Sequence, residues 1–573
     1  MKVLILDGYV DEPTCLGVPP YVSTYVRYVA GSLVDAGIKP DDIDYITIDK
    51  LRENLNLKNY KGENYFEDFL SALKKSYIKD YDLIIVISGL TVPGRYLGFT
   101  PISYSELLAL SKLKGPVKIL GGPIRFGFAF KGGNLASDIS ELKYEFISLG
   151  DIEKDVQVAL SYIRQKNFFK ILKNYRTVDE IDKWTLLGSF ILKKHPLYPL
   201  LVCEIETYRG CERKFHCSFC TEKLYGAPQH RSLEGILREL HILKEIGISH
   251  IRFGKHPNIL GYLALEEEKN GFRKPNLKAL KELFQKASLL KFDTLHIDNV
   301  NPGTIYHFPK ESKEALSIIA NCDTPGDVAA FGMESADERV ILENNLKVYP
   351  DQALRAVEIV NEVGAFKLEK YGEYKLLPGL NFLIGLKGET RKTFKKNIKF
   401  LEEILKKDLL VRRVNIRQVM IFPGTTLYEE EIHPKTKYQN EFKHFKYWVR
   451  NVFDHYMLKK VYPKGTILKN LVVWEIKDNY SYAKGFGSYP ITVKIPKKFP
   501  LYSQIDIFVV DHKERSLIGV PYPLNVNKED FRILKVALGE NLAKKIILNR
   551  PFKSREDFYK AINKKIYEDH III

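Results

Sequence analysis

The sequence is poor in sulfur: only six of its 573 residues are cysteine and four are methionine. Half of the cysteines lie in one short segment, which excludes the disulfide framework of small secreted proteins. No apolar run approaches the ~20 residues that span a bilayer. The first residues, MKVLILDGYV, form a strand-like segment without the pattern of a cleavable signal. We therefore expect a cytoplasmic protein that does not contact membranes.

Length and charge limit the domain count and the class of partner. A chain of 573 residues is too long for one ordinary core, and roughly three or four domains are expected. The formal net charge is +17, which favours a polyanionic partner such as RNA, because lysine and arginine release counterions from phosphates when they bind. A thermophilic protein with many surface ion pairs has a similar composition, so the charge alone leaves both interpretations open.

Three cysteines mark the segment with the strongest chemical signal. Cys211, Cys217 and Cys220 are separated by five and then two residues, between an apolar strand-like run and the helical pattern RSLEGILRELHILKEIG. Loops of this kind carry the chemistry of α/β barrels. Thiolates select zinc, copper(I) or iron–sulfur clusters, and a zinc site would need a fourth ligand, for which His216 and Cys203 are candidates. A 4Fe-4S cluster held by three cysteines instead leaves one iron open to a ligand.

The region after this loop predicts a partial (β/α) barrel at 199–430. Five further strand-like runs, SHIRFG, DTLHIDNV, DVAAFGMES, LLPGLNFLIGL and RVNIRQVMIFPG, alternate with helical stretches. Together with the cysteine loop, they resemble the radical S-adenosylmethionine (SAM) superfamily. The usual loop of that family spaces its cysteines three and then two residues apart, with an aromatic residue before the last. Phe219 matches the aromatic residue, whereas the first gap here is longer.

The resemblance extends to the ends of the later strands. The segment FGMES is similar to the fourth-strand motif that meets the ribose and amino-acid part of SAM, NFLIGLKGET to the glycine turn after the fifth strand, and MIFPGTTL to the closing segment. The second strand departs from the family, since it ends in Gly254, Lys255 and His256 where small and acidic residues are usual; a loop histidine that only forms hydrogen bonds is the alternative for His256. The resemblance implies a 4Fe-4S cluster on Cys211, Cys217 and Cys220, and SAM contacts at Phe219, Gly254, Glu334, Ser335 and Gly385.

Residues 1–165 alternate short β-rich runs with helical patterns, which predicts a doubly wound parallel sheet. This half resembles the cobalamin-binding Rossmann domain that precedes many radical SAM barrels, and Gly121 and Gly122 match the glycine pair that lies against the corrin. The histidine motif that ligates cobalt in classical members is missing. The alternative to cobalamin binding is a sheet that serves only in packing or in binding a partner. Residues 166–198 show no clear period and are predicted to form a connector.

The last quarter of the chain predicts three smaller units. Residues 431–484 have a helical pattern, and 485–526 alternate tightly, as in a small antiparallel β-barrel. This barrel resembles the TRAM/OB-like modules of RNA-modifying radical SAM enzymes; Lys494, Lys497 and Lys498 either follow an RNA backbone or form a solvated edge. Residues 527–573 resemble a helix-hairpin-helix tail, a phosphate-binding unit in its own family, although Gly539 is the single glycine of the hairpin. A structural role is the alternative.

The sequence thus predicts an α/β fold with a Rossmann-like sheet, a partial radical SAM barrel, a small β-barrel and a helical hairpin. The implied function is a radical SAM enzyme that uses a 4Fe-4S cluster, SAM and cobalamin to methylate RNA such as tRNA, with electrons from a ferredoxin or flavodoxin. The alternatives are a nucleic-acid-binding protein with a structural cluster, and a radical SAM enzyme without cobalamin that acts on a small molecule or peptide. A methylthiotransferase is disfavoured because its second cluster needs three cysteines in the N-terminal domain, where only Cys15 lies.

Overall fold

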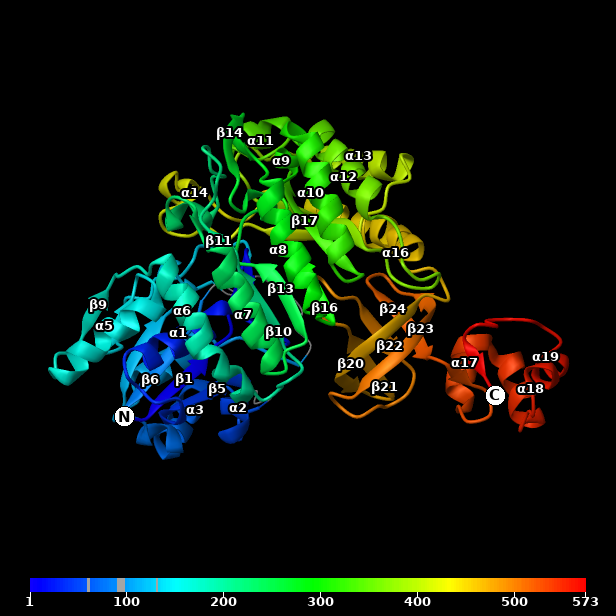
Figure 1. Cartoon of the computed structure of the whole chain (residues 1–573), viewed down its shortest axis with the longest axis horizontal. Helices are drawn as coiled ribbons and strands as arrows, with labels where there is room; N and C mark the ends of the chain where they lie inside the picture. Colours follow the sequence, from blue (N-terminus) through cyan, green and yellow to red (C-terminus); the bar gives the residue numbers. More distant parts are fainter. Residues whose placement is uncertain (59–61, 90–97, 130–131) are drawn as a thin grey trace.

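The computed structural model describes residues 1–58, 62–89, 98–129 and 132–573, and it confirms the predicted α/β fold class. A Rossmann-like domain, a partial barrel, a small β-barrel and a helical tail follow one another along the chain (Figure 1). The small β-barrel lies between the partial barrel and the tail. Within the described part of the chain, no helix is long and apolar enough to cross a membrane.

The N-terminal domain is built on a six-stranded parallel sheet in the order β5-β1-β6-β7-β8-β9. Its strands are β1 (Val3–Asp7), β5 (Ile43–Thr47), β6 (Leu83–Ile87), β7 (Val117–Gly121), β8 (Phe146–Ser148) and β9 (Lys170–Leu172). All five residues of both β1 and β6 are buried, as expected for strands covered on both faces. One face packs on α1 (Thr24–Asp35) and α5 (Ile152–Arg164), and the other on α3 (Tyr65–Lys75) and α4 (Tyr104–Ser111).

The predicted connector at 166–198 instead continues this domain. Strand β9 pairs with β8 as the last strand of the sheet, and α6 (Val178–Gly188) packs against α1. The helix begins at a capping box in which Thr177 and Glu180 exchange hydrogen bonds. A three-residue edge strand is too short to show an alternating pattern, which explains why no period is visible in this part of the sequence.

The central domain is a partial barrel made of two parallel sheets. One sheet contains β10 (Val202–Glu206), β13 (His250–Gly254) and β16 (Thr294–Ile297), and the other contains β17 (Asp327–Glu334), β18 (Leu376–Ile384) and β19 (Arg413–Gln418). A bridge between Asn299 and Ala330 joins them. The outer helices are α7 (Leu233–Glu245), α8 (Leu277–Leu289), α10 (Pro309–Cys322), α12 (Pro350–Gly364) and α13 (Arg391–Lys406).

The N-terminal domain adds backbone pairing at both outer edges of the partial barrel. Strand β4 (Tyr21–Val22) pairs in parallel with β10. At the opposite edge, Leu135 bridges Ile421, and the amide of Ala136 donates to the carbonyl of Ile421 at 2.9 Å. Edge strands expose unpaired backbone groups, and these contacts satisfy part of them. The two domains therefore share one continuous structure, which sequence reasoning did not predict.

The small β-barrel is closed, in the strand order β20-β21-β22-β24-β23. Its strands are β20 (Ile467–Lys477), β21 (Tyr480–Lys484), β22 (Thr492–Ile495), β23 (Gln504–His512) and β24 (Ser516–Pro521). It begins at Ile467 and not at residue 485, so the predicted helical extension contains its first two strands. The helical part is shorter, with α15 (Gln439–Trp448) and α16 (His455–Val461). In β20 four buried residues, 471–474, are consecutive, and this breaks the alternation by which a strand is recognised.

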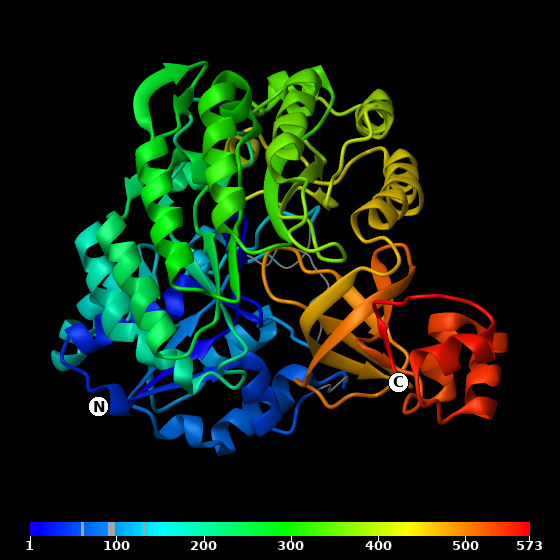
Figure 2. The same ribbon diagram turned by 45° about the vertical axis from the view of Figure 1, so that its right-hand side comes forward.

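Residues 485–491, which we call the plug loop, leave the small β-barrel and close the amino-terminal end of the partial barrel. The amide of Ser488 donates to Nδ1 of His296 at 2.9 Å, and the ring of Phe486 stacks on His250 at 3.7 Å between centroids. Gly487 has φ +102°, and an added Cβ would lie 2.3 Å from Nδ1 of His296. Figure 2 shows the small barrel directly below the partial barrel.

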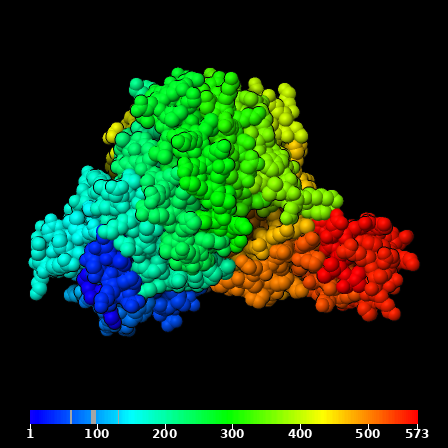
Figure 3. All heavy atoms as spheres, in the orientation of Figure 1, coloured from blue at the N-terminus to red at the C-terminus, as the bar shows by residue number. Residues whose placement is uncertain are grey.

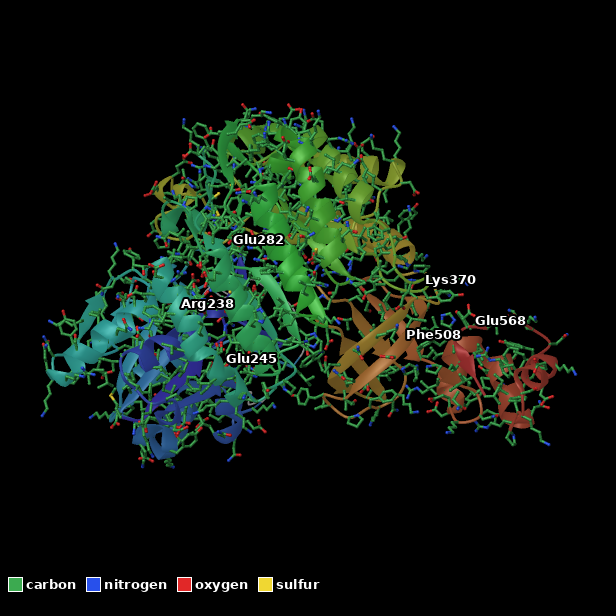
Figure 4. The ribbon with its side chains drawn as sticks, viewed as in Figure 1. Arg238, Glu245, Glu282, Lys370, Phe508 and Glu568 are labelled. Carbon is green, nitrogen blue, oxygen red and sulfur yellow. The ribbon has the colours of Figure 1, made fainter. Side chains whose placement is uncertain are left out.

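The tail projects from the small β-barrel as a separate lobe (Figure 3). It contains α17 (Phe531–Leu538), α18 (Glu540–Asn549) and α19 (Arg555–Ile562). Its core continues onto Phe508 and Val520 of the small barrel. Lys370 of the partial barrel lies beside Glu568 of the tail in Figure 4, and its Nζ is 3.4 Å from Oδ2 of the neighbouring Asp569.

Candidate active site

The cysteine loop is a long excursion closed at its base by a short antiparallel ladder. β11 (Tyr208–Arg209) pairs with β12 (Gln229–His230), and the loop between them carries all three cysteines. Gly210 begins the excursion with φ +87°, and an added Cβ would lie 3.0 Å from the carbonyl oxygen of Gly226. A side chain at this position would therefore be both strained and crowded. The ladder explains how the loop accommodates a longer first cysteine gap.

Contacts to the later strands fix the thiol-bearing part of the loop. Nη1 of Arg213 donates to Sγ of Cys217 at 3.2 Å, and the Ser218 hydroxyl donates to Oδ1 of Asn344 at 2.7 Å. Phe219 and Cys217 pack in one apolar cluster with Ile341, Leu346, Leu386, Val419, Ile421 and Leu427. The predicted aromatic residue thus lies in the same apolar cluster as Cys217 and Cys220.

The three thiols influence one another electrostatically. Burial raises the pKa of the Cys220 thiol to about 12, and Cys217 adds to this shift. Burial also raises the pKa of Cys211, with Glu212, Cys220 and Cys217 among the other causes. Thiols whose pKa is raised in this way need a positive partner to be held as thiolates, and a bound metal cluster supplies one. The donor set therefore fits an iron–sulfur cluster held by Cys211, Cys217 and Cys220.

The proposed fourth ligand Cys203 lies elsewhere. It is buried in β10, and the charged groups that affect its pKa are Arg27, Glu239 and Glu204, not the loop thiols. His216 is in the loop, and its Nε2 is buried without a hydrogen bond to any described residue. Among the described residues, no group of three or more Cys, His, Asp or Glu side chains has a geometry that holds a metal ion. The cluster assignment thus depends on the shared loop and on the family, not on a preformed ion site.

Lys347 is a second charged residue near this centre, after Arg213, that sequence reasoning missed. Burial opposes its charge, but Cys217, Glu334 and Cys220 outweigh that effect and raise its pKa. Its Nζ would lie 2.3 Å from a Cβ added to Gly332, so the glycine of FGMES leaves room for this lysine. A cation between the thiols and Glu334 stabilises negative charge at both.

Glu334 has an unusual backbone for a residue other than glycine. Its φ is +67°, and the register of β17 against β18 shifts between Gly332 and Glu334. Burial raises the pKa of its carboxyl, with Lys347 and Arg417 opposing the shift. Left-handed backbone at such a residue costs about 1–3 kcal/mol and is found preferentially at functional sites. The strain places this carboxyl in the barrel interior beside Lys347.

The N-terminal domain covers the mouth of the barrel with a network of buried charges and tyrosines. Lys255 forms an ion pair with Glu12, and its Nζ donates to the hydroxyls of Tyr25 at 2.8 Å and Tyr225 at 3.1 Å. The hydroxyl of Thr14 donates to Oε1 of Glu222 at 3.0 Å. Because Glu222 and Tyr225 follow Cys220 directly, the 11–16 segment is anchored on the cysteine loop.

Comparison with known proteins decides the family. Residues 205–401 match the family model described as the radical SAM superfamily. An uncharacterized protein of Methanocaldococcus jannaschii is 40% identical over 530 residues, which cover 90% of this chain and 93% of that protein. The chain belongs to the radical SAM superfamily. As a radical SAM protein it is an enzyme that uses a 4Fe-4S cluster and SAM, as the resemblance implied.

Two further comparisons are more distant. A tRNA-2-methylthio-N(6)-dimethylallyladenosine synthase of Anaplasma phagocytophilum is 22% identical over 208 residues, which cover 35% of this chain and 40% of that protein. The solved structure of the radical SAM methyltransferase TsrM from Kitasatospora setae, with cobalamin and a [4Fe-4S] cluster bound, has a TM-score of 0.49 and 13% identity, covering 75% of this chain and 74% of that one.

The other predicted SAM residues lie at the carboxyl ends of the radical SAM strands. Gly254 ends β13, and an added Cβ would lie 1.9 Å from Oε2 of Glu204. The Ser335 hydroxyl accepts from the amide of Asp337 at 3.1 Å. Gly385, at φ +91°, donates its amide to Oε2 of Glu389 at 2.9 Å. Their contacts with SAM stay predictions.

Lys255 and His256, the residues after the second strand that differ from the family pattern, have defined roles in the fold. The side chain of Lys255 reaches the N-terminal domain, as described above. His256 is fully buried; its Nδ1 is 3.0 Å from the Thr207 hydroxyl, and its Nε2 has no hydrogen-bond partner among described residues. The contact with Thr207 is the kind of hydrogen bond that the structural alternative for His256 predicts.

The predicted corrin-contacting glycines have close contacts within the chain. A Cβ on Gly121 would lie 2.8 Å from the side chains of Ile152 and Ser148, and one on Gly122, at φ +95°, would lie 3.1 Å from the carbonyl oxygen of Ser88. These contacts explain why both positions are glycine, and no bound ligand is needed for that explanation. The corrin contact therefore stays a prediction.

Proposed function

We propose that this radical SAM enzyme is a methyltransferase that modifies RNA, with cobalamin as the methyl carrier and a ferredoxin or flavodoxin as the electron donor. The observation that carries this proposal is the contact between the Rossmann-like domain and the cysteine loop. The rings of Phe126 and Tyr225 are 5.5 Å apart, and the Arg125 guanidinium lies 4.8 Å from the Tyr225 ring centroid. Phe126 and Arg125 follow Gly122 at the sheet edge, and Tyr225 follows Cys220.

This contact joins two ligand-binding positions. Doubly wound sheets bind ligands at the carboxyl ends of their strands, near the point where the strand order reverses. Here the order reverses at β1, next to β6. A carrier bound at this edge would lie beside the mouth of the barrel, so a methyl group would travel a short path.

The chain's own residues prepare the site for SAM. When bound, the cluster supplies the electron that breaks a carbon–sulfur bond of SAM. Cys211, Cys217 and Cys220 would hold it, and Lys347 places positive charge next to the thiolates. The 11–16 segment covers the mouth and limits the access of water.

The proposed RNA contact is on the tail and not at the turn of its hairpin. Glu540, at the start of α18, is 2.7 Å from Nζ of Lys535 and 2.9 Å from Nζ of Lys544, so an acidic side chain already neutralises the hairpin lysines. Lys545, Lys553 and Lys564 are exposed, and no described residue forms an ion pair with them. The tRNA substrate named for the distant relative also supports RNA as the first partner to test.

The test is tRNA binding by anaerobically reconstituted enzyme in which these three lysines are replaced by glutamine. Each phosphate that a lysine no longer neutralises lowers the salt slope by about 0.9, so the variant should bind more weakly with a slope reduced by up to about 3. Because the tail is remote from the cysteine loop, formation of 5′-deoxyadenosine from SAM should be unchanged. The control replaces the exposed Lys278, Lys281 and Lys310 of the partial barrel by glutamine.

Three results would contradict the proposal. Equal weakening in the tail variant and in the control would assign binding to net charge alone. Protein that contains no cobalt after growth with cobalamin, yet turns over, would point to a radical SAM enzyme acting on a small molecule or peptide. Protein that never forms 5′-deoxyadenosine would instead support a structural cluster in a nucleic-acid-binding protein. Location in the cytoplasm stays a prediction.

A further inference from the structure

Strand β19 presents two arginines to the barrel interior. Arg413, Asn415 and Arg417 alternate with Val414 and Ile416, which pack in the hydrophobic core between the sheet and the outer helices. Nδ2 of Asn415 donates to Oδ1 of Asn381 at 2.8 Å, on the neighbouring strand β18. The inward face of β19 is therefore polar along its length.

Neither arginine has a carboxylate partner among the residues that the structure describes. The Nε atom of Arg413 is buried without a hydrogen bond to any described residue, and the side chain of Arg417 forms no hydrogen bond or ion pair with a described residue. Arg252, in the same interior, shows the contrast: its Nε is 2.7 Å from Oε1 of Glu204 and its Nη1 is 3.0 Å from Oδ1 of Asp298.

The surroundings of Arg413 contain more positive than negative charge. Burial lowers its pKa to about 9, with Arg515, Arg417 and Arg412 adding to the shift, while its guanidinium lies 5.3 Å from the ring centroid of Tyr489. The nearby carboxyl of Asp454 is 3.9 Å or less from both Arg450 and Arg515. Asp298 and Glu334 are the acidic groups near Arg417, and both also interact with another cation, Arg252 and Lys347 respectively.

Two half-buried guanidinium groups on one strand, each without a carboxylate partner, lose part of their hydration, and a compensating interaction would offset that cost. An anion bound between them would supply it, because a guanidinium donates two parallel hydrogen bonds to a carboxylate or phosphate. The side chains of Arg417, Arg413 and Asn381 are only half-buried although they face inward, so solvent reaches them.

We propose that Arg413 and Arg417 form a subsite inside the barrel for a single anionic group, a phosphate or carboxylate, of the substrate. This inference rests on the proposed function and narrows its substrate class. The plug loop closes the barrel below the subsite, so the anion enters from the mouth.

The carboxylate of SAM is the other source of such an anion, and position argues against it for Arg413. This residue begins β19, whereas the cysteine loop meets the opposite, carboxyl end. Five residues of strand correspond to roughly 17 Å at about 3.3 Å each. Arg417 lies nearer to Glu334 and Lys347, so SAM binding must be measured in both variants.

The experiment measures the thermal midpoint of the reconstituted enzyme against inorganic phosphate, and separately against acetate, at constant ionic strength set with chloride. The wild-type midpoint should rise saturably with one of these anions. Arg413→Gln and Arg417→Gln should each weaken that effect by about tenfold or more, since one charged donor pair is removed. Arg413→Lys keeps the positive charge but loses the two parallel hydrogen bonds of the guanidinium, and it should give an intermediate effect. Arg355→Gln, an exposed guanidinium on α12, should bind like wild type.

The unliganded midpoint separates a binding role from a structural one. Removing an unpaired buried charge should leave that midpoint unchanged or raise it, whereas removing a structural interaction would lower it. The Kd for SAM should change less than threefold in Arg413→Gln. The inference is overturned if neither anion shifts the wild-type midpoint, if both glutamine variants retain the shift, or if phosphate competes with SAM. Failure of RNA methylation alone would leave the anion result intact.

Discussion

The mouth and the base of the partial barrel are both covered by other domains, but with different chemistry. At the mouth, the 11–16 segment meets the cysteine loop through an ion pair, tyrosine hydroxyls and buried carboxyls, centred on Lys255. At the base, the plug loop packs through Gly487, Ser488 and Phe486 against two histidines, one at the start of β13 and one within β16. Polar groups at the mouth can rearrange around a ligand, whereas a glycine in van der Waals contact cannot.

The mouth therefore carries the reactive groups, and the base stabilises the fold. All the thiols of the loop, the strained Glu334 and Lys347 lie toward the mouth, while the base carries close backbone packing. We therefore expect changes at the mouth to remove activity with little effect on stability, and changes at the base to do the reverse. Three experiments test this expectation.

The largest effect is expected from Cys217→Ala. Loss of one of three thiolate ligands should abolish iron retention and 5′-deoxyadenosine formation, because the thiolates hold the cluster directly. Iron per chain and SAM cleavage measure this in anaerobically purified protein. Cys322→Ala, at the end of α10 and far from the loop, is the matched control. A full iron complement in Cys217→Ala would refute the assignment of the ligands.

Gly487→Val tests the base. The new Cβ would lie 2.3 Å from His296 at a positive φ, so strain and crowding together should cost about 2–5 kcal/mol. The midpoint of chemical denaturation should fall, while folded protein keeps its iron. Gly539→Val has a similar φ of +90° with nothing within 4 Å of the added Cβ, and its midpoint should fall less. Equal decreases would mean that the contact with His296 is unimportant.

The effect that is smallest at neutral pH concerns the pH dependence of the mouth. Burial lowers the pKa of His256 to about 3, with Arg252 adding to the shift. Its stabilising contribution is therefore complete above its ordinary pKa of about 6.5 and is lost as the pH falls, by about 1.4 kcal/mol per pH unit. His256→Gln should flatten the acid side of a plot of denaturation midpoint against pH. The exposed His433→Gln serves as control; an unchanged slope in His256→Gln would show that another group dominates.

Some features of the site were predicted from the sequence because the residues that indicate them are close together in the chain. Cys211, Cys217, Cys220 and Phe219 lie within ten residues, and Glu334 ends an apolar strand. Lys347, Arg413 and the pairing of β4 with β10 had no such signal, because each depends on contacts between distant segments. The boundary at residue 485 failed for a related reason: β20 is buried on both sides over 471–474, and consecutive apolar residues do not distinguish a strand from a helix.

The sequence by itself determined the fold class, the six strands of the partial barrel and the loop that carries the thiols, since strand patterns and cysteine spacing are encoded by neighbouring residues. Only the tertiary structure decided which charges are neutralised and which are not. Lys255 and Arg252 find carboxylates from other segments, whereas Arg413 and Arg417 find none among the described residues. Whether a charge is compensated depends on groups within a few ångströms, and packing alone decides which groups those are.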